Sequence, residues 1–131
     1  MMPDAIGIAA TGLGLHRHWL DAIADNIANV NTAEPTSGAA FQARYVIAQA
    51  GPGTSGVYVA GAAFGSAIGR VTHDPGNPLA DANGNVRLPD IDLGSQMGQL
   101  IMAQRGYQAN AAVIDRAQTT YEAALQIGHG A

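Results

Sequence analysis

The sequence of 131 residues contains no cysteine and no lysine. Without cysteine the chain has no disulfide, no thiolate metal site and no cysteine nucleophile. All six basic residues are arginines, scattered from Arg17 to Arg116, and ten acidic residues bring the formal net charge to −4. Because nucleic-acid binding depends on clustered positive charge, we expect no nucleic-acid partner.

Aromatic residues and long apolar runs are also scarce. Phe, Trp and Tyr make up only 5% of the chain, whereas glycine occupies 17 positions. Small side chains bury little apolar area, which is worth about 25 cal/mol per Å², so we expect the isolated chain to be marginally stable. No apolar run reaches the length of a membrane span, and the first residues lack the basic region of a signal peptide. We therefore expect no direct membrane insertion and no cleaved signal peptide.

A stripe of mostly apolar residues, spaced by three and four, lies near each end of the chain. The N-terminal stripe comprises Ile6, Ala9, Leu13, His16, Leu20, Ile23, Ile27 and Val30. The C-terminal stripe comprises Met97, Leu100, Gln104, Tyr107, Ala111, Ile114, Gln118, Tyr121 and Leu125. This spacing predicts two long helices that pack as a coiled-coil-like pair. The first begins between Pro3 and Ile6; the second covers residues 93–127, with Asp90 or Asp92 as its N-cap.

The middle of the chain has a different pattern. β-favouring residues predict strands over 41–49, 57–59 and 67–72, and a further strand over 86–88 that leaves a tight hairpin turn at Asn83–Gly84. The sequence therefore predicts an α+β fold in three parts: an N-terminal helix in residues 1–32, a β-rich central segment with loops in 33–90, and a C-terminal helix in 91–131.

Two short motifs resemble ligand-binding loops. Gly51–Gly56 satisfies the G-x-G-x-x-G pattern, but Val57–Val59 after it predicts a strand where a dinucleotide loop needs a helix. Asp81–Asn85 resembles a calcium loop, yet its glycine comes too early and no glutamate closes it. We interpret the first motif as a strand connector and the second as a hairpin turn.

The histidines and paired carboxylates give no clear catalytic or metal site. His16 and His18 point to different faces of a helix, which suits a metal poorly, and we expect His16 to pack against a neighbouring helix. Asp90 and Asp92 stand before a helix, where capping is the simpler interpretation. We therefore expect no enzyme, no cofactor and no metal. A small hydrolase or metal-dependent enzyme that uses Asp90, Asp92 and His73 remains an alternative.

Asn26 and Asn29 lie near the end of the first predicted helix, although asparagine is a poor helix former. Their side-chain amides could bond the last carbonyls of this helix or the backbone of an adjacent segment. The alternative is an ordinary frayed helix end. The residues alone favour neither interpretation.

Three segments carry a resemblance to a known family. Ala24–Thr32, ADNIANVNT, is similar to the A-N-N-[LI]-A-N-x-x-T signature of the flagellar axial proteins of rod and hook, with Asp25 at the first asparagine position. Asp74–Asp92 resembles the proline-rich stretch of short rod proteins in this family, with Asn85 where tyrosine is usual. Arg105–Asn110, RGYQAN, matches the family's R-x-Y-Q-A-N element. Length and the proline-rich stretch argue against the longer distal rod and hook members. They also favour a different proximal-rod member over its relative FlgB, which remains an alternative.

This resemblance implies a structural subunit of the proximal rod, the drive shaft that carries torque from motor to hook. Members of the family are exported by the flagellar type III apparatus without a cleaved signal peptide and assemble in the periplasm. Their terminal helices form the inner tube, and the middle segment forms an outer β-rich domain. The implied partners are other copies of the chain, the rod proteins FlgB, FlgF and FlgG, and the rod-base adaptor FliE.

The stripes and the resemblance together define the residues expected at the site. The expected assembly interface consists of Leu13, Leu20, Ile23, Asn26, Ile27, Ala28, Asn29, Thr32, Leu100, Tyr107, Gln108, Asn110, Ile114 and Tyr121. The expected family loop motif consists of Pro75, Asn77, Pro78, Leu79, Ala80, Asp81 and Gly84.

Overall fold

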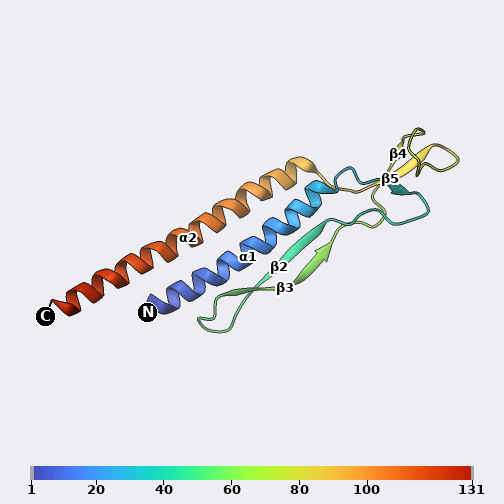
Figure 1. Cartoon of the computed structure of the whole chain (residues 1–131). Helices are drawn as coiled ribbons and strands as arrows, with labels where there is room; N and C mark the ends of the chain where they lie inside the picture. The colour runs from blue at the N-terminus through green and yellow to red at the C-terminus, as the bar shows by residue number, and fades with distance from the viewer. Residues whose placement is uncertain (1, 131) are drawn as a thin grey trace.

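Two long helices run side by side along most of the molecule in the computed structural model, which describes residues 2–130 (Figure 1). Helix α1 spans Met2–Ala28 and helix α2 spans Leu93–His129. They are antiparallel, so both termini lie at the same end of the molecule. The predicted α+β fold, with a pair of terminal helices around a strand-rich centre, is confirmed.

Helix α2 begins at a well-formed N-cap. The Asp92 side chain accepts a hydrogen bond from the Gly94 amide at 3.0 Å, which satisfies one of the free donors of the first turn. Of the two predicted caps, Asp92 is confirmed and Asp90 lies exposed before it. The helix continues to His129, two residues past its predicted end.

Strands β2, Arg44–Ala50, and β3, Val57–Phe64, form an antiparallel two-stranded sheet. A register shift between Ile47 and Ala48 marks a β-bulge. The segment Gly51–Gly56 joins the two strands, which confirms that it is a strand connector. Strand β3 extends well beyond the predicted 57–59. The prediction stopped at Val59 because the small residues after it pair through their backbone and have little intrinsic preference for strands.

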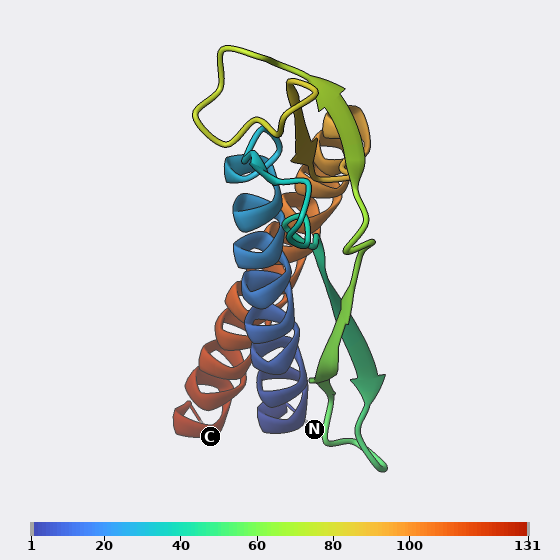
Figure 2. The same ribbon diagram turned by 90° about the vertical axis from the view of Figure 1, so that its right-hand side faces the viewer.

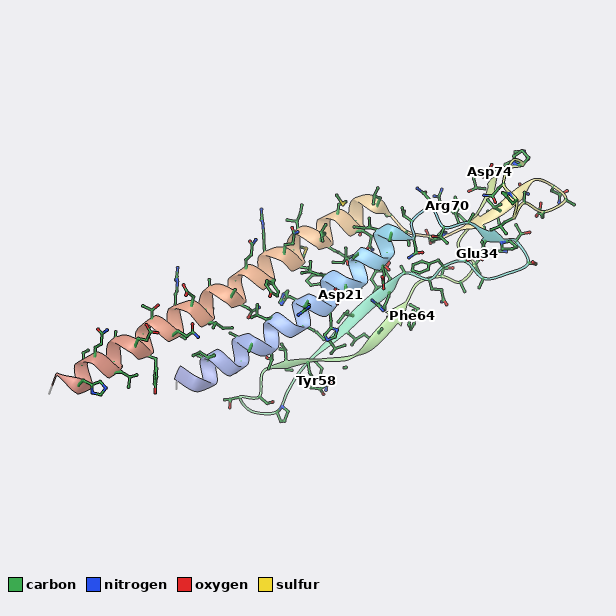
Figure 3. The ribbon with its side chains drawn as sticks, viewed as in Figure 1. Asp21, Glu34, Tyr58, Phe64, Arg70 and Asp74 are labelled. Atoms are coloured by element: carbon green, nitrogen blue, oxygen red, sulfur yellow. The ribbon has the colours of Figure 1, made fainter. Side chains whose placement is uncertain are left out.

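This hairpin lies along α1 on the side away from α2, so α1 is the central element (Figures 1 and 2). A two-stranded hairpin is marginal on its own and needs a surface to pack against. The Thr11 hydroxyl on α1 provides one fixed point, because it accepts a hydrogen bond from the Val57 amide at 3.1 Å. Tyr58 lies near the turn of this hairpin (Figure 3).

A second, smaller sheet lies at the end of the molecule away from the termini, where Figure 3 labels Glu34, Arg70 and Asp74. Its antiparallel strands are β1, Glu34–Pro35, β5, Asn85–Leu88, and β4, Arg70–His73, in the order β1-β5-β4. Strand β1 was not predicted, since two residues that include a proline carry no periodic signal.

A long loop, not a two-residue hairpin turn, joins β4 to β5. The turn at Asn83–Gly84 exists, and the Gly84 amide donates to the Asp81 carbonyl at 2.9 Å. His73 pairs with Asn85, however, so the whole segment between them forms the connection. The prediction of a tight hairpin was wrong because hydrogen bonds to the Asp81 side chain stabilise a longer loop.

Most buried apolar residues are small. The buried set is Ala9, Ala22, Ile23, Ala40, Ala43, Val86, Ile91, Ala103 and Ala117. Alanines allow helix backbones to approach closely but bury little area each. Shape and polar contacts therefore contribute much of the specificity of this packing.

Candidate assembly interface

A single buried amide joins three elements at the end of α1. The Asn26 side chain is 1% exposed and that of Gln96 on α2 is 2% exposed. Asn26 Nδ2 donates to Gln96 Oε1 at 3.1 Å and to the Arg44 carbonyl at 2.9 Å. The Arg44 amide in turn donates to Asn26 Oδ1 at 2.8 Å. Of the two interpretations left open by the sequence, the hydrogen-bonded one is therefore correct for Asn26.

Asn29 and Thr32 close the last turn of the same segment. Asn29 Nδ2 donates to the Asp25 carbonyl at 2.8 Å, and the Thr32 hydroxyl donates to Asn29 Oδ1 at 3.0 Å. Asp25, which departs from the family pattern, forms an ion pair with Arg44 at 2.8 Å. Both side chains of this pair are about half exposed, so we expect it to contribute little to stability.

Midway along the helix pair, each helix places a polar side chain over a glycine of the other. Asn110 on α2 lies over Gly12, and His16 on α1 lies over Gly106. His16 Nδ1 is 2.7 Å from the Gly12 carbonyl, so this nitrogen carries the proton and donates it. Asn110 Nδ2 donates to the Gly106 carbonyl at 2.9 Å. The expectation that His16 packs against a neighbouring helix is confirmed.

The contact between Asn110 and His16 is packing, not a hydrogen bond. Asn110 Nδ2 lies 3.5 Å from His16 Nδ1, and both nitrogens are donors once His16 bonds the Gly12 carbonyl. The two helices therefore approach through shape, with a side chain of one filling the space that a glycine of the other leaves. A Cβ atom at Gly12 would lie 2.5 Å from Asn110 Oδ1, which leaves no room for a side chain.

The stripe of α2 that faces α1 lies one residue before the predicted stripe. The observed stripe contains Gln96, Ala103, Gly106, Asn110 and Ala117. The predicted stripe was wrong where it placed five residues on the inner face of the pair, since the structure leaves them exposed: Met97, Gln104, Tyr107, Ala111 and Gln118. The physical reason is that small residues permit a closer approach of the two backbones than large apolar ones.

The residues expected at the assembly interface fall into three groups in the single chain. Ile23 and Asn26 are buried. The half-buried ones are Leu13, Leu20, Ile27, Asn29, Thr32, Leu100, Asn110 and Ile114. The exposed ones are Ala28, Tyr107, Gln108 and Tyr121. Only the exposed and half-buried groups are accessible to a neighbouring molecule.

The family loop motif is organised around one carboxylate. Asp81 accepts hydrogen bonds from the Asn83 amide at 2.9 Å, the Asn85 amide at 3.0 Å and the Thr36 hydroxyl at 2.8 Å. These bonds, that from Asn85 first, hold the pKa of the Asp81 carboxyl below its ordinary value of 3.8. Asn77 Oδ1 accepts from the Leu79 amide at 3.0 Å in the same loop.

The rest of this motif follows the loop. Ala80 and Gly84 are half-buried, and the exposed members are Pro75, Pro78 and Leu79. Gly84 has a φ of +76°, a left-handed conformation that a residue with a Cβ rarely adopts.

Two of the three groups in the alternative enzyme hypothesis have structural partners, and the third, Asp90, is exposed. Asp92 caps α2, and His73 Nδ1 lies 3.1 Å from Asn85 Oδ1. Within residues 2–130, no group of three or more His, Asp or Glu side chains is placed to hold a metal ion. Over the same residues, neither helix combines the length and apolar character needed to cross a membrane.

Gln96 is the central residue that the sequence analysis missed. A heptad signal could have found it, because Gln96, Ala103, Asn110 and Ala117 recur every seven residues. Arg44 gave no signal, since its contribution comes from its backbone at the start of β2.

Comparison with known proteins agrees with this architecture. Residues 82–127, which include most of α2, match the family model described as the C-terminal region of flagellar basal body rod FlgEFG proteins. Over 125 residues the chain is 35% identical to the flagellar basal-body rod protein FlgC of Salmonella typhimurium, covering 92% of this chain and 93% of that protein. It is 36% identical to FlgC of Yersinia enterocolitica at the same coverage, and 30% identical to FlgC of Borreliella burgdorferi over 97% of both chains.

The paired terminal helices around a strand-rich centre, with a rod-type C-terminal region, define a structural protein of the flagellar basal-body rod. This class agrees with the resemblance found in the asparagine, proline-rich and RGYQAN segments. Among rod proteins, the chain belongs to the FlgC family.

Proposed function

We propose that this chain is a subunit of the proximal rod, and that it assembles through α1 and α2 to transmit torque from motor to hook. The observation that carries the proposal is the way residue types are distributed around α2. Small and polar residues face α1, and many large apolar side chains lie outside the helix pair. The exposed large apolar residues of α2 are Leu93, Met97, Ile101, Met102, Tyr107, Val113, Tyr121, Leu125 and Ile127.

This much exposed apolar surface on one helix is unusual for a monomer and typical of an assembly surface. The interface we propose comprises the accessible part of the expected set, with Ile27 on α1 and Tyr107, Gln108 and Tyr121 on α2 at its centre. Ile23 and Asn26 contribute indirectly, because they hold α1 in its place beside α2.

The partners we propose are other copies of the chain, FlgB, FlgF, FlgG and the adaptor FliE. Export through the flagellar type III apparatus, without a cleaved signal peptide, would deliver the chain to the periplasm. Two features support this route. The chain has no disulfide to form before export, and its buried apolar residues are mostly alanines, which makes unfolding for export easy.

We infer that the chain has no catalytic activity. The inference is supported by the carboxylates and histidines that have structural partners: Asp81 in its loop, Asp92 at its cap and His16 in the helix pair.

A deletion and replacement experiment in the source bacterium tests the proposed function. We expect loss of the gene to abolish motility and rod formation, and an epitope-tagged copy to restore both and to co-purify with basal bodies. Normal basal bodies in the deletion strain, or a tagged copy that is absent from them, would contradict the proposal.

A further inference from the structure

The loop between β4 and β5, residues 74–84, contains the dipeptide Asn83–Gly84, whose chemistry the proposed function does not use. We call this segment the Asp81 loop. It lies at the end of the molecule away from the termini, where Figure 3 labels Asp74. Asn83 is exposed and takes part in the loop through its backbone amide, which donates to Asp81 Oδ1 at 2.9 Å. An asparagine before glycine is prone to deamidation, because glycine has no side chain to hinder attack by its own backbone nitrogen.

Deamidation joins the backbone nitrogen of Gly84 to the side-chain carbon Cγ of Asn83. The Gly84 nitrogen gives up its proton, a new N–Cγ bond closes a succinimide ring, and the Asn83 side-chain nitrogen leaves as ammonia. Water then opens the ring at either of its carbonyls, which leaves aspartate or isoaspartate in place of Asn83. The reaction needs only water as a co-reactant.

In the folded loop the attacking nitrogen is held in a hydrogen bond. The Gly84 amide donates to the Asp81 carbonyl at 2.9 Å, and the Gly84 carbonyl accepts from the Asp74 amide at 2.8 Å. Attack requires the Gly84 nitrogen to lose its proton and to turn toward the Asn83 side chain, so its bond to Asp81 has to break first. The closed loop therefore hinders the reaction until it opens.

A residue distant in sequence helps to keep the loop closed. The Thr36 hydroxyl donates to Asp81 Oδ2 at 2.8 Å, while Asp81 Oδ1 accepts from the amides of Asn83 and Asn85. Thr36 directly follows β1, which pairs with β5 in the small sheet. The bond from Thr36 therefore forms only when this sheet has assembled.

We propose that Asn83 is a deamidation site that the folded Asp81 loop protects, so that the modification accumulates on chains in which the small sheet is not folded. This inference goes beyond the proposed function and concerns the isolated chain. Isoaspartate adds a carbon atom to the backbone before Gly84, which displaces the Gly84 amide from the Asp81 carbonyl. Either product also places a new carboxylate close to that of Asp81, and the two repel each other. A modified loop is therefore harder to close again.

Trypsin gives a direct readout, because cleavage after Arg70 and Arg87 releases residues 71–87 as a single peptide. This peptide also contains Asn77 and Asn85, which serve as internal controls. Asn77 precedes a proline, whose nitrogen has no proton to lose. Asn85 precedes a valine, whose branched side chain hinders the attack.

Mass spectrometry of this peptide, after incubation of the chain at neutral pH, measures the rate of modification at each asparagine. We expect modification at Asn83, at least about tenfold slower in the folded chain than in the same chain in guanidinium chloride. Equal rates in the two states would overturn the inference. Modification of Asn85 ahead of Asn83 in the unfolded chain would overturn the assignment of the site.

A substitution at Thr36 tests whether the bonds of Asp81 provide the protection. Thr36→Val removes the hydroxyl with little change in size, and Thr36→Ser retains it as the matched control. In variants that circular dichroism shows to be folded, we expect deamidation at Asn83 to be at least about threefold faster in Thr36→Val than in the parent. Thr36→Ser should behave as the parent does. A parental rate in folded Thr36→Val would overturn the role assigned to the loop.

Hydrogen exchange at the Gly84 amide tests the same link in the parent chain, without any substitution. If the loop must open before the attack, exchange at this amide and deamidation at Asn83 should be slowed by the same factor, within about threefold, relative to the unfolded chain. Fast exchange at Gly84 combined with slow deamidation at Asn83 would overturn the inference.

Discussion

Asn26 holds the end of α1 through three hydrogen bonds, one to the side chain of Gln96 and two to the backbone of Arg44. Asn26→Leu removes the partner of Gln96 Oε1 and of both backbone groups of Arg44, whereas Gln96→Leu leaves one Asn26 N–H unpaired. Since each unsatisfied group costs about 1–3 kcal/mol, we expect both variants to unfold at lower denaturant concentration, Asn26→Leu by more. Equilibrium unfolding followed by circular dichroism measures this.

The double variant Asn26→Leu/Gln96→Leu distinguishes loss of the Asn26–Gln96 hydrogen bond from independent destabilisation by each substitution. Because each single change already breaks the same bond, we expect the double variant to lose less than the sum of the two single losses. Strictly additive losses would mean that the two amides do not interact.

The glycines of the helix pair give a matched series. Gly14 and Gly98 have open space where a Cβ would lie, so Gly14→Ala and Gly98→Ala should stabilise the chain by up to about 1 kcal/mol through helix propensity. Gly12→Ala and Gly106→Ala place a methyl against Asn110 and His16, and we expect both to destabilise it. Thermal unfolding distinguishes the two classes, and equal shifts at all four positions would contradict the close packing.

The Asp81 loop should respond to acid. Its carboxyl has a pKa lowered by the hydrogen bonds from Asn85 and Thr36, so the folded loop favours the ionised form. This stabilisation is present above the unfolded pKa and is lost as pH falls through the lower folded value. We expect the amide NMR signals of Asn83 and Asn85 to titrate with a midpoint below 3.8. Asp81→Asn should remove that transition, and a midpoint at or above 3.8 would contradict the bonding.

At the scale of elements, the helices could be predicted because each has a long, repeated signal. The asparagine segment left hydrogen bonding and a frayed helix end equally open, because its amides find partners in β2 and α2, which lie far away in the sequence. The face of α2 could not be placed from apolar residues alone. Its inner side is marked by small residues: Gly106 of α2 leaves the space that His16 of α1 fills, as Gly12 of α1 leaves the space that Asn110 of α2 fills. The short strand β1 and the full length of β3 depend on pairing partners distant in sequence, so local patterns did not reveal them.

Ile27 tests the role of α1 in assembly. It is half-buried in the single chain and belongs to the proposed interface. Ile27→Asp would bury a carboxylate against apolar neighbours in the rod, which is strongly unfavourable without a partner. We expect loss of rod incorporation and of swimming.

Ala24→Asp is the matched control for Ile27→Asp, because Ala24 is exposed on the same helix and lies outside the proposed interface. It should swim nearly as the parent does. Normal basal-body yield in Ile27→Asp, or equal loss in the control, would exclude Ile27 from the interface.

At the scale of the whole molecule, one asymmetry accounts for the architecture. α1 is covered by α2 on one side and by the β2–β3 hairpin on another, whereas α2 contacts only α1 among the described elements. A helix so uncovered, with large apolar residues outside the pair, is suited to pack in a tube of identical and related helices.

A cryo-electron microscopy map of basal bodies from the source bacterium tests this claim most directly. The account predicts α1 and α2 of this chain in the inner wall of the proximal rod, with the exposed side chains of α2 against helices of neighbouring subunits. The small sheet should lie farther out. A rod in which α2 faces solvent along its length, or in which this chain has no density, would contradict the account.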